Sequence, residues 1–284
     1  MSTMADTVTL LKLAETDVAQ EIPKEQFGPV ILQPPFVFVD GTFNTRDLGL
    51  VPNSPLRANF AYRSGSLSHL TDNGKAVLAG KLGIKRIFDL RSPKERKHDP
   101  DPIIPDIENT WIQSSRPDSH LDLNKFLSGG GEVGYEEMYL EVVDFYQPAW
   151  KVILEHVKDR PQDPFLVHCV AGRDRTGVLG GLLLTLAGAS PDVVTLDYLL
   201  SRIGTEPVRK RLLAFAMAGT SAESEEQPGF YNMCSLRASC WNAFIAGLQR
   251  EYGGYEQFVI DKLGFSGEDL AKIKANLTSP STKK

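Results

Sequence analysis

The chain has 284 residues, 42% of them hydrophobic and 24% charged, and a formal net charge of −5. This composition excludes a disordered or fibrous chain, and the acidic balance argues against a nucleic-acid partner, because phosphate backbones require a basic surface. The longest apolar run, residues 178–189, is shorter than the ~20 residues of a membrane-spanning helix, so we expect no transmembrane segment.

Three cysteines, Cys169, Cys234 and Cys240, are too few and too irregularly spaced for a disulfide framework or a zinc site. The N-terminal residues lack a basic segment followed by an apolar stretch and a cleavage site, so we expect no signal peptide. These features favour a cytoplasmic, reducing setting, in which a reactive thiolate persists.

Segments that favour strands alternate with helix-forming segments over the first two thirds of the chain. Residues 1–30 are predicted to form an arm or a cover on the substrate side, followed by a single domain over residues 31–278 and a tail over 279–284. Strands are predicted at residues 36–39, 58–63, 84–90, 111–113 and 165–167, and a helix at 71–82. Residues 41–49 are predicted as a polar turn, 93–106 as a surface connection and 114–134 as a flexible loop.

Helix-forming patterns dominate the last third of the chain. Helices are predicted at residues 136–146, 148–158, 178–186, 191–202, 207–218, 236–252, 255–263 and 267–276, with an acidic hinge at 219–229. This order favours an α/β fold with a helical C-terminal part over about residues 190–278. That part either forms a lid over a site or buttresses the sheet.

Residues 167–177, VHCVAGRDRTG, combine the groups needed to hold and attack a phosphoryl group. A predicted strand ends here, a tight loop follows and a helix begins, with five residues between Cys169 and Arg175. A loop at a helix N-terminus directs backbone N–H groups and the positive end of the helix dipole at an anion. Arg175 can match two phosphate oxygens, and Cys169 is expected to attack as a thiolate. The predicted phosphate cradle consists of Val170, Ala171, Gly172, Arg173, Asp174 and Arg175.

Two neighbours of Cys169 are predicted to support it. His168 is expected to hydrogen-bond inward and favour the thiolate, and Thr176 is expected to hydrogen-bond the sulfur. The alternative for Cys169 is a buried cysteine ahead of a core helix. Small core residues are expected at Cys234 and Cys240.

The segment HCVAGRDRTG resembles the HCxxGxxR[ST] signature loop of cysteine-based protein tyrosine phosphatases. Further motifs are similar to those of the tyrosine/serine phosphatase family of bacteria and fungi: NTRDLG at 44–49, YRSGSLS at 62–68, DLRS at 89–92 with Glu95, and DYLLS at 197–201. The resemblance implies a protein-tyrosine-phosphatase-like central sheet flanked by helices. It also implies a cysteinyl-phosphate intermediate and no metal or other cofactor. Thr45 in place of Phe and Arg173 in place of Lys depart from the family pattern.

Loss of the leaving group calls for a general acid, and no tryptophan of this chain is followed by the Pro-Asp of a mobile acid loop. Asp174 is the preferred candidate, although it could instead cap the helix. Asp89 ends a strand, where it could act as the acid or pair with Arg91 or Arg63. Asp118 lies on the predicted flexible loop, where it could be a mobile acid or simply solvated.

Four further charged residues are candidates for supporting roles. Arg46 and Asp47 either buttress the site, as the resemblance implies, or form a surface ion pair in a turn. Arg63 is expected to pair with Asp89 or Asp47. Arg173 could contact a second phosphate or point outward into solvent.

These features predict a phosphomonoesterase, most simply a protein-tyrosine phosphatase that could also accept phosphoserine or phosphothreonine. Its partner would be a phosphorylated protein. The alternative is a phosphoinositide phosphatase with the same chemistry in a different pocket. An alternative of another class is a non-catalytic module that captures phosphorylated ligands. That module would need a lost nucleophile or arginine, whereas Cys169 and Arg175 are both present.

Overall fold

The computed structural model describes residues 7–115, 121–220 and 222–279. A five-stranded sheet with the order β1-β2-β5-β3-β4 lies at its centre. Its strands are β1 (Arg46–Asp47), β2 (Ala61–Ser64), β3 (Arg86–Asp89), β4 (Glu108–Trp111) and β5 (Phe165–His168). Strand β1 is antiparallel to β2, and the other neighbours are parallel. The carboxyl ends of the parallel strands therefore share one edge, where ligands of open α/β sheets bind.

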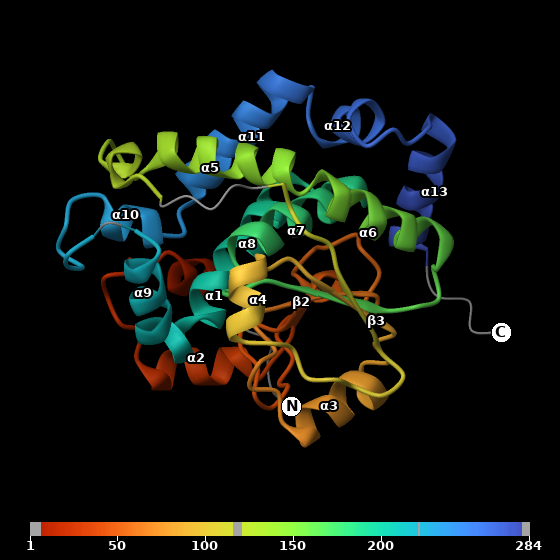
Figure 1. The fold of residues 1–284 in the computed structure, drawn as a ribbon, viewed down its shortest axis with the longest axis horizontal. Coiled ribbons are helices and arrows are strands. Elements are labelled where there is room, and N and C mark those ends of the chain that lie inside the picture. Colours follow the sequence, from red (N-terminus) through yellow and green to blue (C-terminus); the bar gives the residue numbers. More distant parts are fainter. Residues whose placement is uncertain (1–6, 116–120, 221, 280–284) are drawn as a thin grey trace.

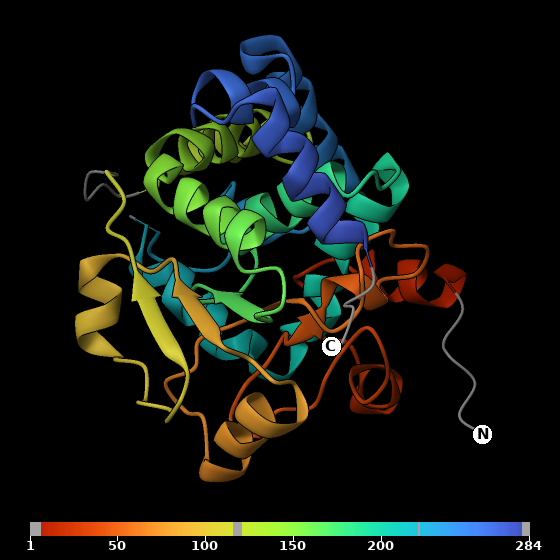
Figure 2. The ribbon, with the colours of Figure 1, turned by 90° about the vertical axis from the view of Figure 1, so that its right-hand side faces the viewer.

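Helices cover both faces of this sheet (Figure 1). Figure 2 shows α5 (Glu132–Phe145), α6 (Gln147–Asp159) and the last three helices of the chain stacked on one face, with α3 (Asp72–Ala76) on the other. The helices are α1 (Thr7–Ala14), α2 (Lys24–Ile31), α3 (Asp72–Ala76), α4 (Pro93–His98), α5 (Glu132–Phe145), α6 (Gln147–Asp159), α7 (Asp174–Leu186), α8 (Pro191–Gly204), α9 (Arg209–Ala218), α10 (Phe230–Cys234), α11 (Ala238–Tyr252), α12 (Tyr255–Asp261) and α13 (Gly267–Thr278). Shorter turns are η1 (Leu48–Leu50), η2 (Val77–Lys81), η3 (Leu123–Phe126) and η4 (Glu206–Val208). This is the predicted α/β class with a helical C-terminal part.

Alternate side chains of the central strands enter two separate cores. Phe165 and Val167 of β5 and Phe88 of β3 belong to the larger core, on the side of the long helices. Leu166 and Ile87 belong to the smaller core. Successive strand residues point to opposite faces, so a parallel strand covered on both sides is a continuous apolar run. Burial of each such side chain stabilises the fold by roughly 1.5–3 kcal/mol.

The prediction of a first strand at residues 36–39 is wrong. Phe36 forms an isolated bridge to Arg46, and the strand itself is β1, inside the segment predicted as a polar turn. Gly41, with a φ of +82°, turns the chain back between the two. Arg46 and Asp47 are fully buried although they are charged, so hydrophobic periodicity could not identify this strand.

Two predicted connections contain ordered structure. The loop predicted at 114–134 includes η3, whose Leu123 and Phe126 are buried. The surface connection predicted at 93–106 includes α4, which begins with a capping box between Ser92 and Glu95. Strand β4 begins earlier than the predicted 111–113, because its polar, partly exposed residues carry little strand signal.

The first 30 residues, predicted as an arm, include two helices. Leu10 and Ala14 of α1 are buried in the larger core, and α1 packs against α8. In the part of the chain that the structure describes, no helix is long and apolar enough to span a bilayer.

Candidate active site

The signature loop leaves β5 after His168 and enters α7 at Asp174. Gly172 has a φ of +64°, and a Cβ at this position would lie 2.3 Å from the backbone oxygen of Ser64. Only glycine therefore fits here without backbone movement. The predicted helix at 178–186 thus begins four residues early, with the end of the loop forming its first turn.

Three backbone carbonyls of this loop, those of Val170, Ala171 and Gly172, accept hydrogen bonds from residues outside it. The amide of Ser66 donates to the oxygen of Val170 over 3.0 Å. The side-chain amide of Asn44 donates to the oxygens of Ala171 and Gly172 over 3.1 and 3.0 Å. The N–H of each peptide points opposite to its carbonyl, so the amides of the following residues face away from these partners. Amides turned in this way are what the predicted phosphate cradle requires.

A buried cluster of charged side chains supports the loop on the side of α8. Asp197 of α8 accepts hydrogen bonds from Arg46 and Arg63, over 2.8 and 2.5 Å, and all three side chains are buried. Arg63 also donates to the oxygen of Gly172 over 2.7 Å. The prediction that Arg63 pairs with Asp89 or Asp47 is therefore wrong, because Asp197 is its carboxylate partner. Arg46 is not part of a surface ion pair but of this cluster.

The side chain of Asp47 has different partners from that of Arg46, its neighbour in sequence. Its carboxylate accepts from the amides of Gly49 and Asn59, over 2.8 and 2.6 Å, and so caps η1 and joins it to the start of β2. Burial raises the pKa of Asp47 to about 6, and the two backbone hydrogen bonds oppose this rise.

Arg175 forms a bidentate ion pair with Glu95 of α4. The guanidinium donates to both oxygens of Glu95, over 2.7 and 2.9 Å, and to the backbone oxygen of Leu90 over 3.1 Å. Burial alone would raise the pKa of Glu95, but the charge and hydrogen bonds of Arg175 outweigh it and lower that pKa to about 2. This bidentate pair fixes the plane of the guanidinium.

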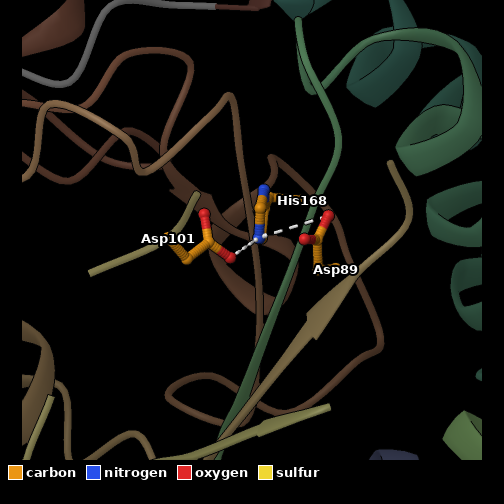
Figure 3. Close-up of side chains that lie close together, drawn as sticks. All are labelled: Asp89, Asp101 and His168. Atoms are coloured by element: carbon orange, nitrogen blue, oxygen red, sulfur yellow. Dashed lines mark hydrogen bonds and ion pairs between the residues drawn. The ribbon is translucent and has the colours of Figure 1, made fainter. Parts of the chain in front are cut away.

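His168 lies between two carboxylates (Figure 3). Its Nε2 is 2.9 Å from an oxygen of Asp101 and 3.8 Å from an oxygen of Asp89, and its Nδ1 is 3.4 Å from the backbone oxygen of Cys169. Although burial raises the pKa of Asp101, the hydrogen bond and charge of His168 and the charge of Arg91 lower it to about 2. The inward hydrogen bond expected of His168 thus goes to Asp101.

Asp89 has no exposed side-chain surface and is held by Arg91. The guanidinium of Arg91 donates to both oxygens of Asp89 over 2.9 Å each, and Arg96 lies 3.2 Å from the same carboxylate. The pair of Asp89 with Arg91 is the alternative that the sequence left open beside a role of Asp89 as the acid. Arg91 donates to Asp101 as well, over 2.7 Å.

The side chains of Asp89, Asp101 and His168 place their ligand atoms within 4.8 Å of one another, a spacing that could hold a metal ion. Arg91 already donates to both carboxylates, however, and so balances their charge. A cation here would have to share this space with a buried guanidinium, so the residues do not fit a metal site.

Asp174 faces the cavity from the first turn of α7. Its carboxylate accepts from the hydroxyl of Tyr139 over 2.8 Å and from Nε of Arg173 over 3.1 Å. Its side chain is 27% exposed, whereas that of Asp89 is 0% exposed. Asp174 is therefore the better placed of the two to meet a substrate. Asp118, the third candidate, lies outside the described residues.

Arg173 lines the cavity and does not point outward into solvent. Its guanidinium donates to the backbone oxygens of Cys234 and Met233, over 2.5 and 3.4 Å, at the end of α10. A cation at a helix C-terminus satisfies carbonyls that the helix leaves free. The alternative of an outward, solvated arginine is therefore wrong, whereas contact with a second phosphate stays a prediction.

Cys169 and its neighbour Thr176 are both buried. The side chain of Cys169 is 2% exposed, at the base of the loop. The Thr176 hydroxyl has no hydrogen-bond partner among the described residues, so the expected bond to the sulfur is not formed here. Cys234 and Cys240 are free thiols in the core, and burial raises their pKa values to about 12 and about 11.

A cavity of about 160 Å³ opens onto the signature loop, and Cys169, Asp174 and Arg175 line it. Much of its remaining wall is apolar and comes from α9 and two other segments: Leu121, Met138, Leu212, Leu213, Phe215 and Ala216. The C-terminal part thus contributes a wall of the cavity, and its role as a lid stays a prediction.

The chain matches the model of the tyrosine phosphatase family over residues 37–279. It belongs to the tyrosine phosphatase family. It is accordingly a phosphatase enzyme, as its sequence predicts. The tyrosine-protein phosphatase of Nostoc commune is 30% identical over 217 residues, which cover 76% of this chain and 73% of that protein.

A second relative is the triple specificity protein phosphatase PtpB of Mycobacterium tuberculosis, 28% identical over 251 residues that cover 78% of this chain and 87% of that protein. Among solved structures, the catalytic core of the PP-IP phosphatase SIW14 of S. cerevisiae aligns with 55% of this chain and 86% of that chain. Its sequence identity is 18% and its TM-score 0.31, too low for a comparison of the two sites.

Several contacts around the phosphatase loop are not predicted from the sequence. Glu95 and Asp197 belong to motifs noted in the sequence, but nothing there predicts that Glu95 pairs with Arg175 or that Asp197 pairs with Arg46. Asp101 and Tyr139 carried no signal, because one lies in a charged connection and the other in a predicted core helix. The strand–loop–helix pattern alone cannot indicate such long-range partners.

Proposed function

We propose that Cys169 attacks the phosphorus of a phosphomonoester and that Asp174 protonates the leaving oxygen. An S–P bond forms as the P–O ester bond breaks, and the alcohol or phenol leaves with the proton. Water then attacks the cysteinyl-phosphate, Asp174 takes its proton, the S–P bond breaks and inorganic phosphate is released.

The observation that carries this proposal is the shared cavity of Cys169, Asp174 and Arg175. In this mechanism the loop amides and Arg175 hold the phosphoryl oxygens, whose charge they are preorganised to meet. Glu95 fixes Arg175, and the Asp197 cluster fixes the loop. Asp89 acts through Arg91 and His168 as a positioning residue rather than as the acid.

The cavity wall favours an aryl phosphate over a phosphoinositide. Leu121, Met138 and Phe215 offer apolar contact to a phenol ring. Three further arginines line the cavity, Arg173, Arg202 and Arg209, and each donates to backbone oxygens. Arg173 and Arg202 are also paired with a carboxylate. The apolar contacts therefore carry the choice of substrate, and phosphotyrosine in a protein is the proposed substrate.

Turnover without added metal on a phosphotyrosine peptide, a phosphoserine peptide and a phosphoinositide panel tests this assignment. We expect the phosphotyrosine peptide to be the best substrate. Cys169→Ser should abolish turnover while retaining phosphopeptide binding, and Arg175→Ala should lose both. A preference for the lipids would promote the phosphoinositide alternative. Tight peptide binding without turnover by the native chain would indicate a capture module.

We also propose that the protein works in a reducing compartment such as the cytoplasm. Cys169, Cys234 and Cys240 are all free thiols. A cysteine nucleophile must remain reduced to attack phosphorus.

A further inference from the structure

The chain between α1 and α2, residues 16–22, reaches the cavity of the candidate active site. We call these residues the N-terminal connector. Val18 of the connector lines the same cavity as Cys169 and is 9% exposed. The match to the tyrosine phosphatase family begins only at residue 37. The connector is thus a part of the cavity wall that the family match does not include.

The connector is held by a buried arginine of α8. Arg202 donates to the backbone oxygens of Thr16 and Gln20, over 2.9 and 2.6 Å, and its guanidinium also pairs with Glu206. The other oxygen of Glu206 accepts the amide of Ile22 over 2.8 Å. A buried ion pair thus satisfies both carbonyls and an amide of the connector, which fixes its backbone against the domain.

A second arginine ties the connector to α9. Arg209, the first residue of α9, donates to the backbone oxygens of Val18 and Ala19 over 2.7 and 2.9 Å. Helix α9 carries Leu212, Leu213, Phe215 and Ala216 of the cavity wall. The backbone of Val18 is therefore bonded to the helix that supplies four apolar residues of the wall, which leaves its side chain little freedom to move aside.

We propose that Val18 is a specificity-determining residue, which sets the size of the group that can accompany the phosphoryl group into the cavity. The inference rests on the proposed phosphatase mechanism for the reaction but concerns only the choice of substrate. A larger side chain at this position should exclude a phosphotyrosine with flanking peptide before it excludes a small aryl phosphate. A smaller side chain should weaken the discrimination against the peptide.

The experiment compares kcat/KM for p-nitrophenyl phosphate and for a phosphotyrosine peptide in Val18→Trp, Val18→Ala and the native chain. For Val18→Trp we expect kcat/KM on the peptide to fall about tenfold or more, with less than about a threefold change on p-nitrophenyl phosphate. For Val18→Ala we expect the ratio of peptide to p-nitrophenyl phosphate to rise about threefold.

Val8→Trp and Val8→Ala provide matched controls, since Val8 lies on α1 and is 75% exposed. Neither should change the ratio. Equal loss on both substrates in Val18→Trp, or an unchanged ratio in both Val18 variants, would overturn the proposal. No turnover of either substrate by the native chain would instead refute the proposed phosphatase function.

Discussion

Glu95 holds Arg175 through both carboxylate oxygens, at 2.7 and 2.9 Å, from a helix that begins four residues after β3 ends. The pair is largely buried, with 18% and 15% of the two side chains exposed. Its geometry leaves the guanidinium plane defined before any substrate arrives, which lowers the cost of ordering it on binding.

Replacement Glu95→Gln should therefore weaken phosphate recognition. Glutamine keeps the size but loses the charge and one acceptor, so the guanidinium is no longer fixed at both ends. We expect kcat/KM on p-nitrophenyl phosphate to fall on the order of tenfold, with weaker inhibition by inorganic phosphate. Glu268→Gln, an exposed carboxylate on α13, is the control. Unchanged phosphate inhibition in Glu95→Gln would contradict this role.

Leaving-group dependence distinguishes the candidate acids. Asp174→Asn should lower kcat/KM, which reports the step that expels the leaving group, about 10²-fold or more on phenyl phosphate and much less on p-nitrophenyl phosphate, whose phenolate needs little protonation. Tyr139→Phe, which removes the hydrogen bond to Asp174, should show a weaker form of the same pattern. Asp89→Asn should affect both substrates equally. A steeper leaving-group dependence in Asp89→Asn than in Asp174→Asn would identify Asp89 as the acid.

Asp101→Asn should reduce the reactivity of Cys169. Asp101 accepts from His168, whose other ring nitrogen faces the backbone oxygen of Cys169, so loss of the carboxylate charge removes the support for the imidazole beside the nucleophile. The rate of Cys169 alkylation by iodoacetamide at fixed pH should fall several-fold. The exposed Asp99→Asn serves as the control. Alkylation at the native rate in Asp101→Asn would show that the carboxylate does not act on the cysteine.

Asp197→Asn should be strongly destabilising. It leaves Arg46 and Arg63 buried with half of their carboxylate contacts gone, and removing one partner of a buried ion cluster costs about 3–5 kcal/mol of unfolding free energy. Urea denaturation followed by circular dichroism measures the loss. Asp261→Asn, on an exposed turn of α12, should stay within about 0.5 kcal/mol of the native chain. A similar small effect for Asp197→Asn would be inconsistent with a structural role of the cluster.

The pH dependence of stability should have two limbs of opposite sign. The pKa values of Glu95 and Asp101 are lowered to about 2, so their contribution is complete above about pH 4.5 and is lost as the pH falls toward 2. The pKa of Asp47 is raised to about 6, so it favours the folded state below about pH 4 and loses that contribution as the pH rises through 6.

Urea denaturation between pH 2.5 and pH 7 tests both limbs. Glu95→Gln should flatten the decline of unfolding free energy below about pH 4.5, and Asp47→Asn should flatten the decline between about pH 4 and pH 6. If Asp47→Asn keeps the second decline, another group is responsible for it.

The sequence predicted the parallel core strands well, because Phe165, Leu166 and Val167 are apolar on both faces. It failed at β1, whose charged residues have partners inside the protein: Arg46 pairs with the distant Asp197, and Asp47 accepts from the amides of Gly49 and Asn59. The hydrophobic pattern of a sequence indicates where apolar side chains are buried, and it gives no sign of charged side chains that are buried as pairs.

The candidate site shows the same division. The signature loop from Cys169 to Arg175 is local, so its spacing alone predicts a phosphate cradle. The contacts of Arg173 with α10 and of Val18 with the cavity join segments far apart in sequence. No periodicity or motif carries that information, since it depends on how the helices pack.

The contact between Arg173 and the end of α10 has a mechanical consequence. Arg173 is a member of the loop, and its guanidinium is occupied by the backbone oxygens of Met233 and Cys234. Any displacement of α10 must first break these bonds, after which Arg173 keeps its contact with the carboxylate of Asp174. The position of α10 is thus linked, through a single side chain, to the residue proposed as the acid.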